Sequence, residues 1–360
     1  MNKPQFLGLL LLTGVCAAAQ AAAVAPFSVQ DLVTLHRISD VTVSPDGRRV
    51  AYTLRSTDLS ANRGRKDLWV LELARRGAKP LQLTADPADE YGAQWSADGT
   101  QLYFLSDRGG SAQVWRVPAA GGGAVQVTHA AVDVGSFRLS PTGNRLLISA
   151  AVFADCDLDC TAARLAKSAT HVASGELRER IFVRHWDTWS DGRRSQLFSV
   201  ALDAHGAVSG AAVLLTQGLD GDVPHKPFGG REDYTISPDG ATVVFSIRVG
   251  AKGEPWSTNF DLYAVPAAGG TPRNLTAANP AADLHPSFSP DGARLAYLAA
   301  ERPGFESDRQ RLMLMDPKSG VTKPLTQGWD RSIEDFGWSR DGLSLFAIAQ
   351  HLGQRPLWLI

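Results

Sequence analysis

The stretch FSPDGARLAYLAA, Phe288–Ala300, carries the pattern that decides the fold of this chain. It combines two runs of strand-compatible residues with a central Asp-Gly pair. Glycine at that position supplies the positive φ angle that a tight hairpin turn needs. We therefore expect two short antiparallel strands joined by a two-residue turn. One such stretch by itself would indicate only a hairpin.

The same phrase recurs five more times along the chain. The copies are VSPDGRRVAYT (Val43–Thr53), WSADGTQLYFLS (Trp95–Ser106), LSPTGNRLLIS (Leu139–Ser149), ISPDGATVVFS (Ile236–Ser246) and WSRDGLSLFAI (Trp338–Ile348). Their turn glycines are 52, 44, 97, 52 and 50 residues apart. Four of these steps are close to the about 40–50 residues of one four-stranded propeller blade. A β-sandwich has no reason to repeat its turns at one period, so the repeat favours a β-propeller.

Two further markers recur with the same period. Each unit closes with a branched residue followed by threonine: Leu83-Thr84, Val127-Thr128, Leu215-Thr216, Leu275-Thr276 and Leu325-Thr326. A third strand precedes this marker, as in DLWVLEL (Asp67–Leu73) and DLYAVPA (Asp261–Ala267). We therefore predict an all-β propeller of four-stranded blades, five complete and a sixth partial, preceded by a short helix within Ser28–His36. The sixth is predicted as partial because the sequence ends inside an apolar third strand, Arg355–Ile360.

The 97-residue step has two explanations, a blade without an Asp-Gly turn or a long insertion. Only one closing marker falls within it, and residues 154–180 are polar and partly helical in character. We therefore expect one blade with an insertion of about 40 residues, at about 153–194. The other loops between second and third strands are also long, whereas the Asp-Gly turns stay short. This asymmetry predicts that one face of the propeller carries the function.

The first 25 residues have the features of an export signal. Lys3 precedes the apolar run Phe6–Val15, and an alanine-rich stretch follows to Ala25. The apolar run is too short to span a bilayer as a helix. We therefore expect a signal peptide at 1–25, a propeller at 26–360, and a periplasmic or secreted product. The net charge of −1 gives no electrostatic reason to expect nucleic acid as a partner, or a membrane once the signal is removed.

No residue pattern in the chain indicates catalysis. Neither a G-x-S-x-G elbow nor an H-E-x-x-H motif occurs, so we predict no catalytic residue, no metal ligand and no cofactor. Cys156 and Cys160 are the cysteines that remain after export. In an oxidising compartment a local disulfide is the first expectation, ahead of free thiols or metal ligands.

Three charged or aromatic clusters on the expected functional face remain as candidate substrate contacts. Arg184 and Trp186 belong to RHWDTW at the end of the insertion, where the tryptophans alternatively pack the insertion onto its blade. Glu306 and Asp308 lie in the loop RPGFESDR, which is either a recognition loop or a self-paired turn. Glu232 precedes the fourth blade and either holds a cationic ligand or is simply solvated.

Several longer phrases resemble a known family. HRISDVTVSPDGRRVAY (36–52), RHWDTW (184–189), REDYTISPDG (231–240), PSFSPDGARLAYLAAERPGFESDR (286–309) and TQGWDRSIEDFGWSRDG (326–342) are similar to the prolyl oligopeptidase family of serine peptidases. The resemblance is greatest to its exported bacterial dipeptidyl-peptidase-5-like and acylaminoacyl-peptidase-like branch, and it covers essentially all of the chain after Ala25. The SPDG phrase alone also occurs in Tol-type propellers.

The resemblance implies a propeller that precedes an α/β-hydrolase domain with a Ser-Asp-His triad. In that family the propeller caps the active site, admits short peptides and can supply acidic residues for the substrate amino terminus. The hydrolase domain is absent from this sequence, so it is the expected missing partner, and the chain alone is expected to be inactive. The alternative is a stand-alone Tol-type periplasmic propeller that acts as a protein-binding module.

Overall fold

The computed structural model describes residues 26–360 except 171, 174, 176, 179–183 and 186–187. The predicted signal peptide at 1–25 therefore lies outside the described residues. The described chain divides into two units, of which the first ends at Leu35 and the second is His36–Ile360. In the first, the expected short helix forms as α1 (Val29–Thr34), because Ser28 and Asp31 cap its start reciprocally, each side chain accepting the other's backbone N–H. No helix within the described residues is long and apolar enough to cross a membrane.

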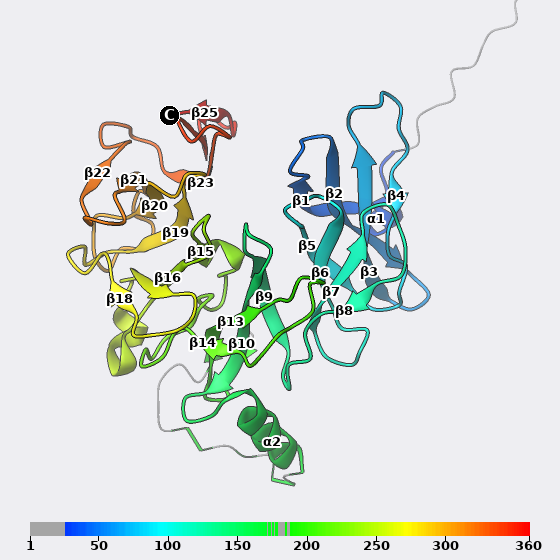
Figure 1. The fold of residues 1–360 in the computed structure, drawn as a ribbon, viewed down its shortest axis with the longest axis horizontal. Coiled ribbons are helices and arrows are strands. Elements are labelled where there is room, and N and C mark those ends of the chain that lie inside the picture. The colour runs from blue at the N-terminus through cyan, green and yellow to red at the C-terminus, as the bar shows by residue number, and fades with distance from the viewer. Residues whose placement is uncertain (1–25, 171, 174, 176, 179–183, 186–187) are drawn as a thin grey trace, which may run out of the picture. The chain divides into compact units, whose positions relative to one another are not determined.

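The second unit is an all-β propeller with six blades (Figure 1). Blade one comprises β1 (Arg37–Val43), β2 (Arg49–Asp58), β3 (Arg63–Glu72) and β4 (Leu81–Gln82); blade two comprises β5 (Glu90–Trp95), β6 (Gln101–Ser106), β7 (Gln113–Pro118) and β8 (Val125–Gln126). Blade three comprises β9 (Val134–Leu139), β10 (Arg145–Phe153), β13 (Arg193–Ala201) and β14 (Val213–Leu214); blade four comprises β15 (Tyr234–Ile236), β16 (Thr242–Ile247), β17 (Asp261–Pro266) and β18 (Arg273–Asn274). Blade five comprises β19 (Asp283–Phe288), β20 (Leu295–Ala299), β21 (Arg311–Met315) and β22 (Thr322–Pro324); blade six comprises β23 (Ile333–Trp338), β24 (Leu345–Ala349) and β25 (Leu357–Leu359).

The prediction of five complete blades and a partial sixth is not borne out, because all six blades form sheets. Blade six has the order β23-β24-β25, with Leu357 to Leu359 paired antiparallel with Phe346 to Ile348. The apolar stretch that ends the sequence is therefore a paired strand of that sheet.

The Asp-Gly pair lies in a longer turn than the sequence predicts. In blade five, Ser289 N–H donates to Arg294 O (2.9 Å), which leaves four residues, 290–293, between the paired ends. The Asp291 carboxylate accepts from the Ser289 hydroxyl (2.5 Å) and the Ala293 N–H (3.0 Å), and Gly292 has a φ of +70°. Serine and aspartate together satisfy the turn's backbone and hydroxyl donors, so the two-residue turn is corrected to a four-residue one.

The closing threonine has a defined structural role in five blades. Its Oγ1 accepts a backbone N–H from the third strand, at 2.9–3.3 Å. The donor and acceptor pairs are Leu68 with Thr84, Val114 with Thr128, Leu197 with Thr216, Leu262 with Thr276 and Leu312 with Thr326. The branched residue before each threonine extends the same ladder through its own backbone N–H. This marker therefore ends the fourth strand by joining it to the third.

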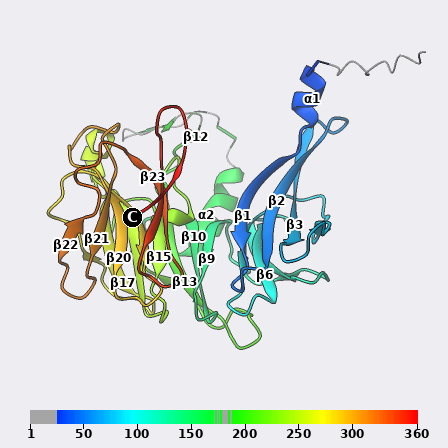
Figure 2. The same ribbon diagram turned by 90° about the horizontal axis from the view of Figure 1, so that it is seen from above.

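The hydrophobic core lies between neighbouring blades rather than within them. Phe245 of blade four packs with Leu197 of blade three, and Leu262 of blade four packs with Tyr297 of blade five. Equivalent clusters join blades one and two, two and three, and five and six. The sheets of blades four and five lie side by side in both views (Figure 2). Each blade therefore buries its faces against its neighbours, as expected for a repeat protein.

Additional elements follow β10 before the third strand of blade three, β13, begins. They are α2 (Leu158–Ala169) and the two-stranded pair β11 (Arg184–His185) and β12 (Thr188–Trp189). Asp157 caps α2 by accepting the Cys160 N–H (2.8 Å), and Leu158 and Leu165 pack against the core between blades two and three. The structure also links Cys156 to Cys160 in a disulfide, with a Cα–Cα distance of 5.2 Å.

We expect mass spectrometry of the non-reduced protein to find Cys156 and Cys160 linked, because the disulfide spans the start of α2. The peptide mass should be two hydrogens below that of the reduced form. Because the closed loop is short, replacing both cysteines with serine should increase proteolysis at α2 and leave the melting temperature of the propeller nearly unchanged. Two thiols that alkylate fully without reductant would contradict the pairing.

Candidate functional site

A cavity of about 320 Å³ opens between blades three and four. Its lining combines charged side chains with aromatic ones. The lining residues are Thr188, Trp189, Ser190, Asp191, Arg193, Arg194, Asp222, His225, Lys226, Pro227, Arg248, Glu254 and Phe260. These residues come from the segments between the second and third strands of both blades, from the start of β13 and from the link between the blades. The cavity therefore lies on the face where the sequence places its long loops.

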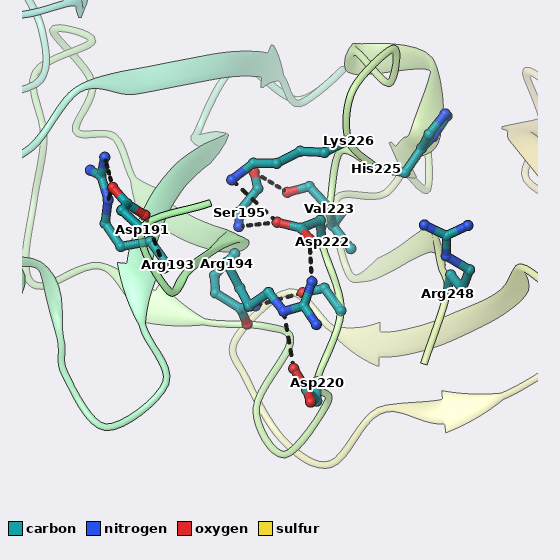
Figure 3. A network of polar contacts seen from close by, with 12 residues as sticks. Asp191, Arg193, Arg194, Ser195, Asp220, Asp222, Val223, His225, Lys226 and Arg248 are labelled. Atoms are coloured by element: carbon teal, nitrogen blue, oxygen red, sulfur yellow. Dashed lines mark hydrogen bonds and ion pairs between the residues drawn. The ribbon is translucent and has the colours of Figure 1, made fainter. Parts of the chain in front are cut away.

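Arg194 is the centre of the charge network beside this cavity (Figure 3). It stands near the start of β13, where its Nε contacts Asp220 Oδ1 at 3.0 Å and its Nη1 contacts Asp222 Oδ2 at 2.9 Å. The same guanidinium makes a two-pronged contact with Glu254, from the 3-10 helix Ala251–Trp256. Burial alone would lower the pKa of Arg194, but Glu254, Asp222 and Asp220 raise it above its usual value. Arg194 is therefore a permanent cation that joins blade three to the loop of blade four.

The carboxylates that line the cavity are all paired with cations. Asp222 also contacts Lys226 Nζ at 3.5 Å and accepts the Ser195 N–H at 2.6 Å. Glu254 also contacts Arg248 at 3.7 Å. Asp191 contacts Arg193 at 2.6 Å (Figure 3). Among the described lining residues, no carboxylate is left uncompensated for a positively charged ligand. The cavity is better suited to carbonyl groups and to apolar or aromatic side chains, since Trp189 and Phe260 supply its apolar wall.

His225 connects the cavity to a second group of polar side chains. Its ring lines the cavity and lies edge-on to Phe260, with the ring centroids 5.0 Å apart. On its other side, Nδ1 lies 2.6 Å from Asp233 Oδ2, which also accepts the His225 backbone N–H (3.0 Å). Asp233 ends the 3-10 helix Arg231–Asp233 just before β15. One donor atom each from Asp233, Glu232 and His285 lie within 4.8 Å of one another.

The structure brings two of the sequence-predicted contacts near this region. Arg184 is exposed on β11, with its guanidinium 5.5 Å from the ring of Trp189, which lines the cavity. Glu232 is exposed beside Asp233 and His285. Trp186 lies outside the described residues. Glu306 is exposed in the loop between β20 and β21. These roles as substrate contacts stay predictions.

Asp308 has an internal structural role instead. Its carboxylate accepts the backbone N–H groups of Glu301 and Arg302 and the Arg302 Nε, each at 2.8 Å. Burial would raise the pKa of Asp308, but these hydrogen bonds hold it well below its usual value. Since its oxygens are engaged in fixing the loop 301–308, we do not include Asp308 in the proposed site.

The sequence did not single out Arg194, Asp222, Glu254, His225 or Phe260. Each is an ordinary polar or aromatic residue in its own segment, and no short motif contains two of the paired charges. The available signal was their location, because Arg194 and Glu254 fall in two of the long loops expected on the functional face.

Comparison with known proteins agrees with the phrases in the sequence. Residues 37–176 match the family model described as the TolB beta propeller domain. Dipeptidyl-peptidase 5 of Porphyromonas gingivalis is 28% identical over 335 residues, covering 91% of this chain and 47% of that protein. The resemblance inferred from the sequence is confirmed. The chain spans about half the length of the dipeptidyl-peptidase-5 proteins that it matches.

Solved structures show the same fold at low identity. The acylaminoacyl peptidase of Pyrococcus horikoshii aligns with a TM-score of 0.62 at 14% identity, over 91% of this chain and 45% of that one. The β-propeller domain of the Trilobed protease from Pyrococcus furiosus aligns with a TM-score of 0.54 at 12% identity, over 90% and 82%. These alignments show a shared propeller fold, and the dipeptidyl-peptidase-5 relatives supply the link to peptidases.

Proposed function

We propose that this chain is the substrate-gating propeller of an exported serine peptidase that acts on short peptides. The partner of this propeller in the proposed peptidase is a catalytic α/β-hydrolase domain, and the propeller without that domain is expected to be inactive. The observation that carries the proposal is the match to dipeptidyl-peptidase 5, which includes 91% of this chain but only 47% of the relative. The relatives and the sequence Lys3 to Ala25 support export to the periplasm or beyond.

The cavity between blades three and four is the part of the propeller that we propose contacts peptides. Its volume of about 320 Å³ lies at the lower end of the range for ligand pockets, about 300–1,000 Å³, and accommodates a few side chains rather than a folded protein. Its charges are already paired through Arg194, so its walls are held in place without a ligand. Trp189, with Arg184 over its ring, forms the border on the side of β11 and β12.

We expect the purified chain to hydrolyse neither dipeptidyl nor acylaminoacyl chromogenic substrates, because its sequence contains no nucleophile elbow. A product extended through an in-frame downstream G-x-S-x-G domain should hydrolyse them and react with a fluorophosphonate. The matched control is the extended product with that serine changed to alanine. Turnover by the chain alone that survives mock purification and is blocked by the fluorophosphonate would contradict the proposal.

The second candidate is a stand-alone Tol-type propeller that binds proteins. The match of residues 37–176 to the TolB beta propeller model favours it. The downstream DNA separates the two candidates. A hydrolase domain there, in frame or frameshifted, supports the peptidase, whereas an unrelated gene would favour the binding module.

A further inference from the structure

Three possible metal ligands from two blades converge beside the cavity. Glu232 and Asp233 lie in the 3-10 helix that leads into β15 of blade four, and His285 lies in β19 of blade five. One donor atom from each lies within 4.8 Å of the others, close enough for a single ion to contact all three. His285 is 52 positions from Asp233 in the sequence, so the packing of blade four on blade five creates the cluster.

Asp233 provides the independent sign that this cluster holds a ligand. Its side chain is 0% exposed, and its Oδ2 takes both contacts from His225. Its Oδ1 is buried and has no hydrogen-bond partner among the described residues. A buried carboxylate oxygen without a partner is costly, because it has lost its water and gained nothing in exchange. A cation at Oδ1 would remove that cost.

The surrounding charges do not supply this cation. Within the described residues, neither Glu232 nor Asp233 forms an ion pair with lysine or arginine, and His225 is the basic partner of Asp233. Arg138 is nearby, but its guanidinium donates to the Arg231 carbonyl (2.6 Å) and lies over the ring of Tyr234. Among the described residues, the basic groups placed against the cluster are therefore the imidazoles of His225, beside Asp233, and His285.

We propose that Glu232, Asp233 and His285 bind a divalent transition-metal ion such as Zn²⁺. One imidazole nitrogen and carboxylate oxygens form a mixed donor set that suits zinc and its neighbours rather than calcium or magnesium. His225 holds the second oxygen of Asp233 and so orients that carboxylate from behind. Exposed Glu232 provides the route of entry. The inference goes beyond the proposed peptidase role, since the ion would tie blade four to blade five whether or not a hydrolase domain is present.

The test is zinc binding to the untagged, chelator-treated chain, followed by calorimetry and by thermal unfolding. We expect one Zn²⁺ per chain and a higher melting temperature with zinc, with weaker effects from Ca²⁺ and Mg²⁺. His285→Gln and Asp233→Asn should each weaken binding more than about tenfold. Exposed His205→Gln and Glu306→Gln are matched controls, and both should bind zinc like the unmodified chain.

A loss of binding through misfolding is separated from loss of a ligand by two measurements. Glu232→Gln alters an exposed residue, so this variant should have the same circular dichroism spectrum and metal-free melting temperature as the parent but bind zinc more weakly. Co²⁺ in place of zinc should give visible absorption bands that change with His285→Gln. The proposal is overturned if the chain shows no saturable zinc binding, or if binding is unchanged in His285→Gln and Glu232→Gln. It is also overturned if a dipeptide with a free amino group binds this cluster and zinc does not compete.

Discussion

Replacing Arg194 with alanine should lower the free energy of unfolding by about 3–5 kcal/mol, the range for removing one partner of a buried ion pair. Asp222 and Glu254, at 8% and 7% exposure, would be left buried without their guanidinium. Lys226 and Arg248 would remain beside these carboxylates, but their contacts, at 3.5 Å and 3.7 Å, are longer than those that Arg194 supplies. The measurement is urea unfolding followed by tryptophan fluorescence, with the midpoint compared at constant slope.

The adjacent residue provides the matched control. Arg193 contacts Asp191, which is about half exposed, so Arg193→Ala should cost no more than about 1 kcal/mol. Arg194→Lys should fall between the two alanine variants, because lysine keeps the charge but cannot make the paired contact with Glu254. Glu254→Gln added to Arg194→Leu should recover part of the stability. Equal effects of Arg194→Ala and Arg193→Ala would show that the network contributes little.

The second large effect concerns the pH dependence of stability at Asp283. This side chain is 0% exposed, and its Oδ2 has no hydrogen-bond partner among the described residues. Burial raises the pKa of Asp283 to about 7, and the neighbouring Asp261 adds to the rise, whereas Asn279, Thr276 and Arg311 oppose it. Asp283 therefore remains protonated in the folded chain at pH values where the unfolded chain has released the proton.

The sign of the pH effect follows from this difference. The contribution of Asp283 to the free energy of unfolding is fully present below about pH 4. It is lost as the pH rises to about 7, and it does not change further at higher pH. A rise from 3.8 to about 7 corresponds to roughly 4 kcal/mol as an upper figure. Asp283→Asn should therefore match the parent at pH 3.5 and exceed its melting temperature at pH 8.

The control for Asp283 has the opposite sign. The Ser289 hydroxyl lowers the pKa of Asp291 in its turn, so that group stabilises the fold above its unfolded pKa and loses the effect as the pH falls. Asp291→Asn should leave unchanged the fall in stability that Asp283 causes between pH 5 and 7. A parent chain and Asp283→Asn with parallel stability curves from pH 4.5 to 8 would contradict the prediction.

The sequence predicted the propeller well because its markers act locally. The Ser289–Asp291 contact spans two residues and the Thr276 contact with strand three spans 14, so both can recur wherever a blade recurs. The same locality explains the errors. The Asp-Gly pair alone does not indicate that Ser289 extends the turn. The apolar residues Leu357–Leu359 were predicted to be an unfinished strand, because their pairing with β24 cannot be predicted from their own sequence.

The sequence by itself determined the repeat, the blade architecture and the face with long loops, because these depend on interactions within one blade. Tertiary structure decided which loop residues meet. Arg194 reaches Glu254 across 60 residues, and Asp233 meets His285 across 52. Both contacts depend on how one blade packs against the next. Large apolar side chains such as Phe245 and Tyr297 determine that packing, and their positions in the sequence do not indicate which charged loop residues will come together.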